Sequence, residues 1–319
     1  MTENNRGIFA PLIGDGRPLL WFTGLMLMLS GIGAIFIAAT GHFLPQDVQY
    51  LGMTASELCQ LHQCRIVHFM IHDRVSWGGS LVAIGSLYMW MVSFPLKRQA
   101  AWSWWVFLIT GILGFGSFLA YLGYGYLDSW HGVATLALLP IFLTGLLRSR
   151  ATLPRDEMFK TIFKPAIKIN VKTREGMGRL LLLFTGLGMI AAGATILIVG
   201  MTAVFVPQDL SFMKVTAEEL RAINERLVPL IAHDRAGFGG GICTTGLAVL
   251  FCVWCGKSSR NLWQVLCLAG TVGFATAIGI HPIVGYNDFV HLAPAMIGAI
   301  TFLVGITLCY KPMVIERHQ

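Results

Sequence analysis

Eight long apolar runs divide the chain, and they restrict its fold more than any other feature. A helix of roughly 20 apolar residues spans the hydrocarbon core of a bilayer. Only 12% of the 319 residues are charged, whereas about a quarter are charged in a typical soluble domain. The sequence therefore predicts an all-α integral membrane protein with eight transmembrane helices. The helices are expected near residues 19–40, 75–95, 102–123, 129–147, 179–203, 236–255, 261–281 and 289–309.

Basic residues concentrate on one side of this predicted topology. The stretch 148–179 holds nine of the 23 Lys and Arg residues, and Lys97, Arg98, Lys257 and Arg260 fall in loops on the same side. Because Lys and Arg near the membrane favour the cytoplasm, we expect a multi-pass protein of the cytoplasmic (inner) membrane with both termini cytoplasmic. We assign the formal net charge of +7 to this topology and to anionic lipid, not to nucleic-acid binding.

The second half of the chain repeats the first. The matching segments are Phe43–Asp47 with Phe205–Asp209, Arg65–Arg74 with Arg226–Arg235, and Gly125–His131 with Gly285–His291. Each half holds four predicted spans, and an even number of spans relates the copies by an axis along the membrane normal. We therefore expect two parallel four-helix-bundle repeats, residues 1–150 and 179–319, joined by a basic cytoplasmic linker at 151–178.

Four histidines occupy matching places in the two halves: His72 with His233, and His131 with His291. They open predicted spans 2, 6, 4 and 8, at one depth near the outward face. Ionisable residues inside a membrane are expensive and usually functional. Histidines at matched depth on parallel helices can ligate a metal in a bundle core, so the sequence predicts two bis-imidazole sites, one for each half.

Charged residues accompany these histidines. Arg74 and Arg235 follow two residues after the first histidine of each half and could hold a carboxylate such as a haem propionate. Asp128 and Asp288 stand three residues before the second histidine and could orient its imidazole, as could Asp73 beside His72. Wide aromatic, glycine-rich walls and only two paired imidazoles favour one or two b-type haems.

Two other interpretations stay open. Carboxylate and imidazole also suit Zn or Fe, so His72, Asp73, Asp128 and His131 could form a metal site without haem. Alternatively, the histidines cap helices or hold a cofactor in a non-catalytic subunit of a larger membrane complex.

The halves differ around the shared histidines. Only the first half has Cys59, Cys64 and His68, and Pro229 stands in place of His68 in the second. Extra polar residues absent from the twin site indicate chemistry, so we predict a reactive first half. The candidate catalytic residues are His68, Asp73, Asp128, Cys59 and Cys64. The two cysteines lie in the first outward loop and are compatible with a disulfide, a redox-active pair or two free thiols.

This arrangement resembles the haem A synthase family, whose members are about as long, have two four-helix halves and keep both termini inside. The likeness is carried by the paired histidines, by the arginines after His72 and His233, and by the pair Cys59 and Cys64. Phe69 stands where the family has a glutamate, and an Asp separates His from Arg in both halves. The resemblance therefore implies a haem-binding scaffold rather than haem A synthesis.

The leading functional prediction is a haem-binding membrane oxidoreductase or electron-transfer protein. The sequence has no nucleotide-binding motif and no CxxCH haem-attachment motif. Its redox partner would therefore be a quinone, a small carrier or another membrane protein.

Overall fold

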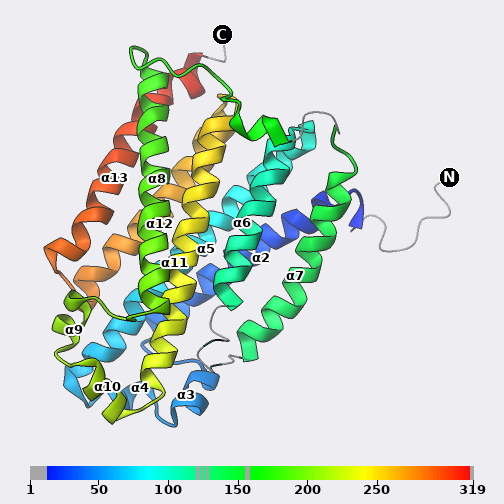
Figure 1. Cartoon of the computed structure of the whole chain (residues 1–319). Helices are drawn as coiled ribbons and strands as arrows, with labels where there is room; N and C mark the ends of the chain where they lie inside the picture. The colour runs from blue at the N-terminus through cyan, green and yellow to red at the C-terminus, as the bar shows by residue number, and fades with distance from the viewer. Residues whose placement is uncertain (1–12, 120–122, 124–125, 127–128, 155–158, 317–319) are drawn as a thin grey trace.

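The computed structural model describes residues 13–119, 123, 126, 129–154 and 159–316, which contain helices and no strand (Figure 1). The long helices are α2 (Arg17–Ala39), α5 (Arg65–Ser93), α6 (Ala101–Leu119), α7 (Ser129–Arg150), α8 (Arg174–Met201), α11 (Leu227–Cys255), α12 (Arg260–Val284) and α13 (Phe289–Tyr310). Four short helices gather at the end of the molecule opposite the C-terminus: α3 (Pro45–Leu51), α4 (Ala55–Cys59), α9 (Pro207–Met213) and α10 (Ala217–Ile223).

Seven helices of the described residues are long and apolar enough to cross a membrane. They correspond to α2, α5, α7, α8, α11, α12 and α13, and the apolar stretch of α6 that qualifies, Ala101–Ser117, is shorter. The prediction of an all-helical, multi-pass membrane protein is consistent with these helices.

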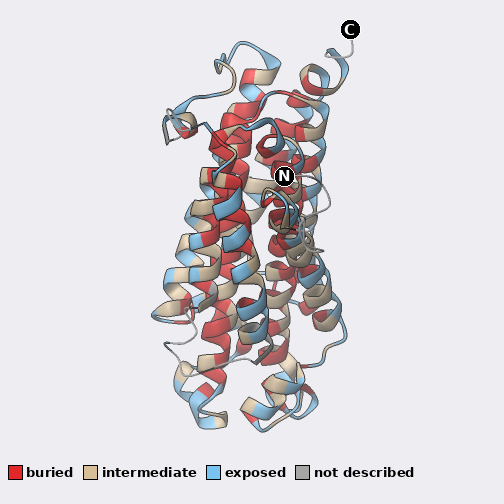
Figure 2. Cartoon of the chain, turned by 90° about the vertical axis from the view of Figure 1, so that its right-hand side faces the viewer, coloured by how far each residue is buried: buried red, intermediate tan, exposed pale blue. Residues whose placement is uncertain are grey.

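Helices α5 and α11 lie at the centre and are buried along most of their length, as the red segments in Figure 2 indicate. The helices around them expose large apolar side chains, for example Phe36 of α2, Leu136 of α7 and Ile283 of α12. An apolar outer surface around a buried pair of helices is what a lipid environment permits and water does not.

The central helices begin earlier than the apolar runs predicted. Helix α5 starts at Arg65 and α11 at Leu227, whereas spans were expected from 75 and 236. His72 and His233 therefore lie about two turns inside their helices and do not open them. The extra turns are buried among the short helices, where Phe69 and Met70 are fully covered. A hydropathy pattern does not detect helix that is buried by protein and carries charged residues.

Glycines allow the helices to approach closely, because they carry no side chain at the contact. A Cβ atom at Gly31 of α2 would meet the Gly78 carbonyl of α5, and Gly193 of α8 faces Gly239 of α11 in the same way. These contacts join spans of one half.

Two further glycines join the halves. A Cβ at Gly79 of α5 would overlap Thr276 of α12, and a Cβ at Gly240 of α11 would overlap Ser117 of α6. Accordingly α5 packs against α2, α11 and α12, while α11 packs against α8, α5 and α6. Each central helix therefore packs against a helix of the other half, and the division into repeats at residues 1–150 and 179–319 stays a prediction.

Candidate functional site

Three histidines converge toward the end of the bundle where the short helices gather: His72 of α5, His281 of α12 and His291 of α13. One ring nitrogen from each lies within 4.8 Å of the others. The ring centroid of His72 lies 4.5 Å from that of His281 and 5.6 Å from that of His291, and the latter two are 5.4 Å apart. His72 and His281 are buried. The cluster brings one histidine of the first half together with two of the second.

This grouping corrects the predicted ligand pairs. His291 was expected to pair with His233, but its ring lies beside His72. The side chain of His131, the expected partner of His72, lies outside the described residues, as does Asp128. The physical reason is the helix packing, since α5 carries His72 against α12 of the other half.

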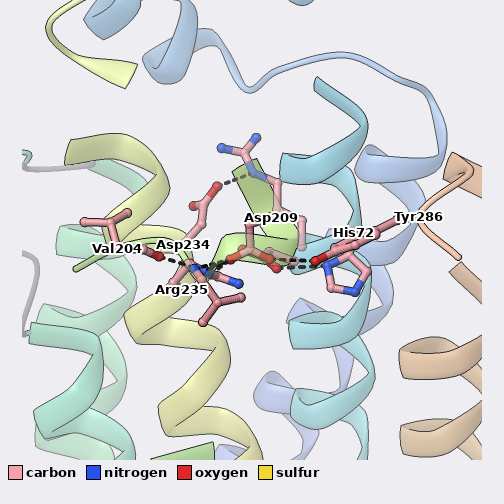
Figure 3. A network of polar contacts seen from close by, with 9 residues as sticks. His72, Val204, Asp209, Asp234, Arg235 and Tyr286 are labelled. Carbon is pink, nitrogen blue, oxygen red and sulfur yellow. Dashed lines mark hydrogen bonds and ion pairs between the residues drawn. The ribbon is translucent and has the colours of Figure 1, made fainter. Parts of the chain in front are cut away.

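A chain of polar contacts extends from His72 to Tyr286 (Figure 3). The Nδ1 atom of His72 lies 3.0 Å from Oδ1 of Asp73, and the other Asp73 oxygen lies 3.4 Å from Nε of Arg235. Arg235 also donates to Oδ2 of Asp209, and the Tyr286 hydroxyl donates to Oδ1 of Asp209 at 2.8 Å. With Nδ1 held by Asp73, the Nε2 atom of His72 is the nitrogen left for a ligand.

Tyr286, the last residue in this series of polar contacts, also contacts the histidine cluster. It lies between α12 and α13, and its ring stacks on His291 with centroids 4.4 Å apart and planes inclined by 26°. Burial, followed by the charge of Asp209, raises the pKa of Tyr286, so its hydroxyl keeps the proton that it donates. We call the five residues His72, Asp73, Asp209, Arg235 and Tyr286 the first network.

A second network repeats these contacts with the halves exchanged. His233 Nδ1 lies 3.2 Å from Asp234, and Arg74 bridges Asp234 at 2.9 Å and Asp47 at 2.8 Å. The Tyr126 hydroxyl donates to Asp47 at 2.6 Å, and its ring meets that of His233 edge-on at 5.1 Å. This network borders a cavity of about 50 Å³ between α2, α5 and α11.

Each network places two carboxylates beside one guanidinium and therefore carries a formal charge of −1. In the first network these groups are Asp73, Asp209 and Arg235, all of them buried. A buried negative charge next to three imidazoles favours a bound cation over an anion.

His281 provides a direct test of whether the cluster fits a metal ion. It is buried, and neither of its ring nitrogens pairs with a polar side chain in the described part of the chain; the polar contacts of the ring are with the backbone of Ala277 and Ile278, one turn earlier on α12. Buried polar atoms are nearly always satisfied, so an imidazole of this kind calls for a further ligand. Three neutral imidazoles are a known ligand set for first-row transition metals. The residues therefore fit a metal ion.

Several predicted site residues have other roles. Arg74 and Arg235 are occupied by the chain's own aspartates, so neither guanidinium is placed to bind a haem propionate. Asp288 is the N-cap of α13, where it accepts a hydrogen bond from the backbone N–H of His291 at 2.7 Å and does not orient the imidazole.

The candidate catalytic residues that only the first half has, Cys59, Cys64 and His68, lie apart from the three-histidine cluster. Cys59 and Cys64 form a disulfide that closes the turn between α4 and α5. His68 is half-buried on α5, and no hydrogen bond, ion pair or ring contact joins it to the three histidines in the described residues. The three-histidine cluster draws on both halves, whereas Cys59, Cys64 and His68 lie apart from it, and the reactive first half stays a prediction.

Sequence reasoning missed three residues of the site: His281, Asp209 and Tyr286. Asp209 lies in a Pro-Gln-Asp motif that the two halves share, and Tyr286 lies in a repeated Gly-Tyr pair. Both were therefore detectable as positions that the two halves share. His281 has no histidine counterpart, since Tyr121 stands near that place in the first half.

Comparisons of the chain with protein-family models, with curated proteins and with solved structures find no match. The resemblance to haem A synthase thus rests on the residues quoted in the sequence alone.

Proposed function

We propose that the chain is a membrane metalloenzyme whose centre is one Zn²⁺ or Fe²⁺ ion held by His72, His281 and His291. The observation that carries this proposal is the convergence of three imidazoles from three helices, with one nitrogen of each within 4.8 Å of the others. The buried His281 ring, which pairs with no polar side chain among the described residues, supports it. Three protein ligands leave a tetrahedral ion with one open position, which is typical of catalytic centres.

A bound ion would supply Lewis-acid chemistry, such as activation of water or polarisation of a substrate oxygen. Neighbouring residues of the chain hold the ligand histidines in position. Asp73 fixes the orientation of His72, and Arg235 holds Asp73 in turn. Tyr286 covers one face of His291 and keeps its hydroxyl on Asp209, so the ligand rings are packed before a ligand arrives.

The proposed architecture has eight spans, with α6 as the eighth, and two interleaved copies of a four-helix unit. The reciprocal contacts of Gly79 with Thr276 and of Gly240 with Ser117 support this repeat. Both termini and the basic linker lie on the cytoplasmic side in this proposal, and the histidines lie near the outer side. The positive-inside bias of the loops supports that orientation.

Metal analysis of the purified protein tests the proposed centre. We expect about one Zn or Fe per chain in the wild type. The variant His281→Tyr should lose nearly all of the metal; tyrosine is chosen because Tyr121 stands near the matching place in the first half. His68→Ala is the matched control, since it changes a histidine on α5 outside the cluster, and it should keep the metal. A wild type that remains free of stoichiometric metal after incubation with Zn²⁺ or Fe²⁺ contradicts the proposal.

The second candidate is the haem-binding oxidoreductase expected from the sequence. The stacking of Tyr286 on His291 favours it, because a tyrosine that contacts a ligand ring and donates to a carboxylate can take part in proton-coupled electron transfer. The triangular arrangement of three rings, however, suits a bare ion better than two ligands on opposite faces of a macrocycle. An absorption spectrum of b-type haem that disappears in His72→Ala would make this candidate the leading one.

A further inference from the structure

A cavity of about 370 Å³ lies at the inward end of the bundle, far from the histidine cluster. It is formed where the loop before α6, the loop between α11 and α12, and the segment after α13 meet. Its lining is basic and polar, with one apolar residue: Arg98, Lys257, Ser258, Ser259, Arg260, Asn261 and Met313. No acidic residue lines it, so its lining carries a formal charge of +3.

The loop between α11 and α12 is held in place by a buried arginine. Arg179 of α8 is almost completely covered, and its guanidinium donates to the carbonyl oxygens of Val253 and Gly256. It also donates to the Ser258 hydroxyl at 2.8 Å and pairs with Glu175. Because these contacts fix the loop from its buried side, the cavity is built in advance of any ligand.

The three cations that line the cavity have no carboxylate partner among the described residues, whereas the two serine hydroxyls already donate to Glu175 and Asn261. Arg98, Lys257 and Arg260 are all exposed. The Asn261 carbonyl oxygen already accepts from Trp90 Nε1 and from the Ser259 hydroxyl, both at 2.9 Å. The amide N–H groups of Asn261 are therefore left to donate, next to the N-terminus of the 25-residue helix α12.

We propose that this cavity binds the phosphate of an anionic phospholipid headgroup from the cytoplasmic leaflet. Three unpaired cations, an amide donor and the positive end of a helix match a phosphodiester, which accepts hydrogen bonds and carries negative charge. The source is a lipid because the cavity lies at the ends of apolar helices, beside the apolar side chain of Met313. This inference does not depend on the proposed metal centre.

The test removes the three cations together. Arg98→Gln, Lys257→Gln and Arg260→Gln are combined in one chain. The matched control changes Lys164, Lys168 and Lys172 to Gln, which removes the same charge from the linker on the same side. Each protein is purified from detergent with phosphatidylglycerol and phosphatidylcholine in equal amounts, and retained lipid is counted by native mass spectrometry. We expect wild type and control to retain one phosphatidylglycerol and the triple variant to retain at least tenfold less.

Equal retention by the triple variant and the wild type overturns the proposal, and so does an equal loss in the control. Inorganic phosphate added without lipid distinguishes the source of the ligand. If phosphate alone binds with the same dependence on the three cations and displaces the lipid, the site takes free phosphate and the lipid proposal is wrong. The single variant Arg260→Gln is measured alongside and should show a partial loss, so a folding defect of the triple variant does not remove the test.

Discussion

The first network, around His72, and the second, around His233, use the same five residue types in the same order, and among the described residues the first also contacts the imidazoles of His281 and His291. In both, a histidine contacts the next residue, an aspartate, and an arginine of the other half bridges that aspartate to another. The ring of His72 then packs against His281 and His291. The ion pairs are therefore common to both halves. His281, which has no histidine counterpart in the first half, distinguishes the candidate metal site around His72 from the network around His233.

The exchange of residues between the halves explains why this framework is duplicated. Arg235 of α11 neutralises Asp73 of α5, and Arg74 of α5 neutralises Asp234 of α11. Each central helix thus carries an aspartate that only the other helix can neutralise. The two networks couple the halves, and neither half can bury its charges alone.

The largest expected effect comes from removing the arginine of either network. It tests whether the two networks contribute equally to the stability of the fold. Arg235→Met leaves Asp73 and Asp209 buried without their cation, and Arg74→Met does the same to its twin aspartates. Loss of one partner from a buried ion pair costs about 3–5 kcal/mol, so both variants should lower the free energy of unfolding by that amount. Denaturant unfolding in one detergent measures it, with the exposed Arg221→Met of α10 as a near-neutral control. A large loss in only one variant would show that the networks are not equivalent.

A smaller effect tests the interleaved packing that produces the exchange. Gly79→Ala places a Cβ against the hydroxyl and Cβ of Thr276, and overpacking of this kind costs about 1–3 kcal/mol of unfolding free energy. Thr276→Ala removes the hydroxyl and should recover part of the loss in the double variant.

The control for this pair is Gly33→Ala, because no atom outside the neighbouring backbone lies within 4 Å of a Cβ built at Gly33. Strictly additive effects of Gly79→Ala and Thr276→Ala would contradict the close contact of α5 with α12.

The smallest expected effect compares the exposed outward helices of the two halves. Glu57 caps α4 and Glu219 caps α10, and each accepts a hydrogen bond from the backbone of the threonine that begins its helix. These bonds lower the pKa of both carboxyl groups. A lowered pKa stabilises the fold above the ordinary glutamate pKa of about 4.3, and this contribution is lost as the pH falls through the folded-state value.

Acidification should therefore speed amide hydrogen exchange in α4 and α10 to a similar extent, after correction for intrinsic rates. Glu57→Gln should remove most of the pH dependence from α4 alone. An unchanged pH dependence in α4 of that variant would show that the cap is not the responsible group.

Two of the three histidines of the cluster, His72 and His291, were predicted as ligands from the sequence, but the grouping was not. Comparison of the two halves identified His72, His233 and His291, because matched ionisable residues in apolar helices are rare. The same comparison singled out His281 as a position where the halves differ but did not include it in a ligand pair, because it has no histidine at the matching place. It also assigned ligand pairs within each half, since a repeat pattern does not contain the packing of one half against the other.

The role of the repeated aspartates was also beyond the sequence. Asp47 and Asp209 stand in the first turn of short helices, and in that position a cap is the ordinary interpretation. Their burial against Arg74 and Arg235 depends on the folding of those helices over the central pair. Composition and apolar runs, in contrast, predicted the helical class and most helix positions, because burial in lipid acts on whole segments.

X-ray absorption at the metal edge of the purified, metal-loaded protein tests the central claim most directly. The account predicts three imidazole nitrogens at about 2.0–2.1 Å from one ion, and the multiple-scattering features of imidazole should weaken in His281→Tyr and His291→Ala but not in His68→Ala. A spectrum with four equatorial pyrrole nitrogens, or one unchanged by loss of His281, would contradict the three-histidine centre.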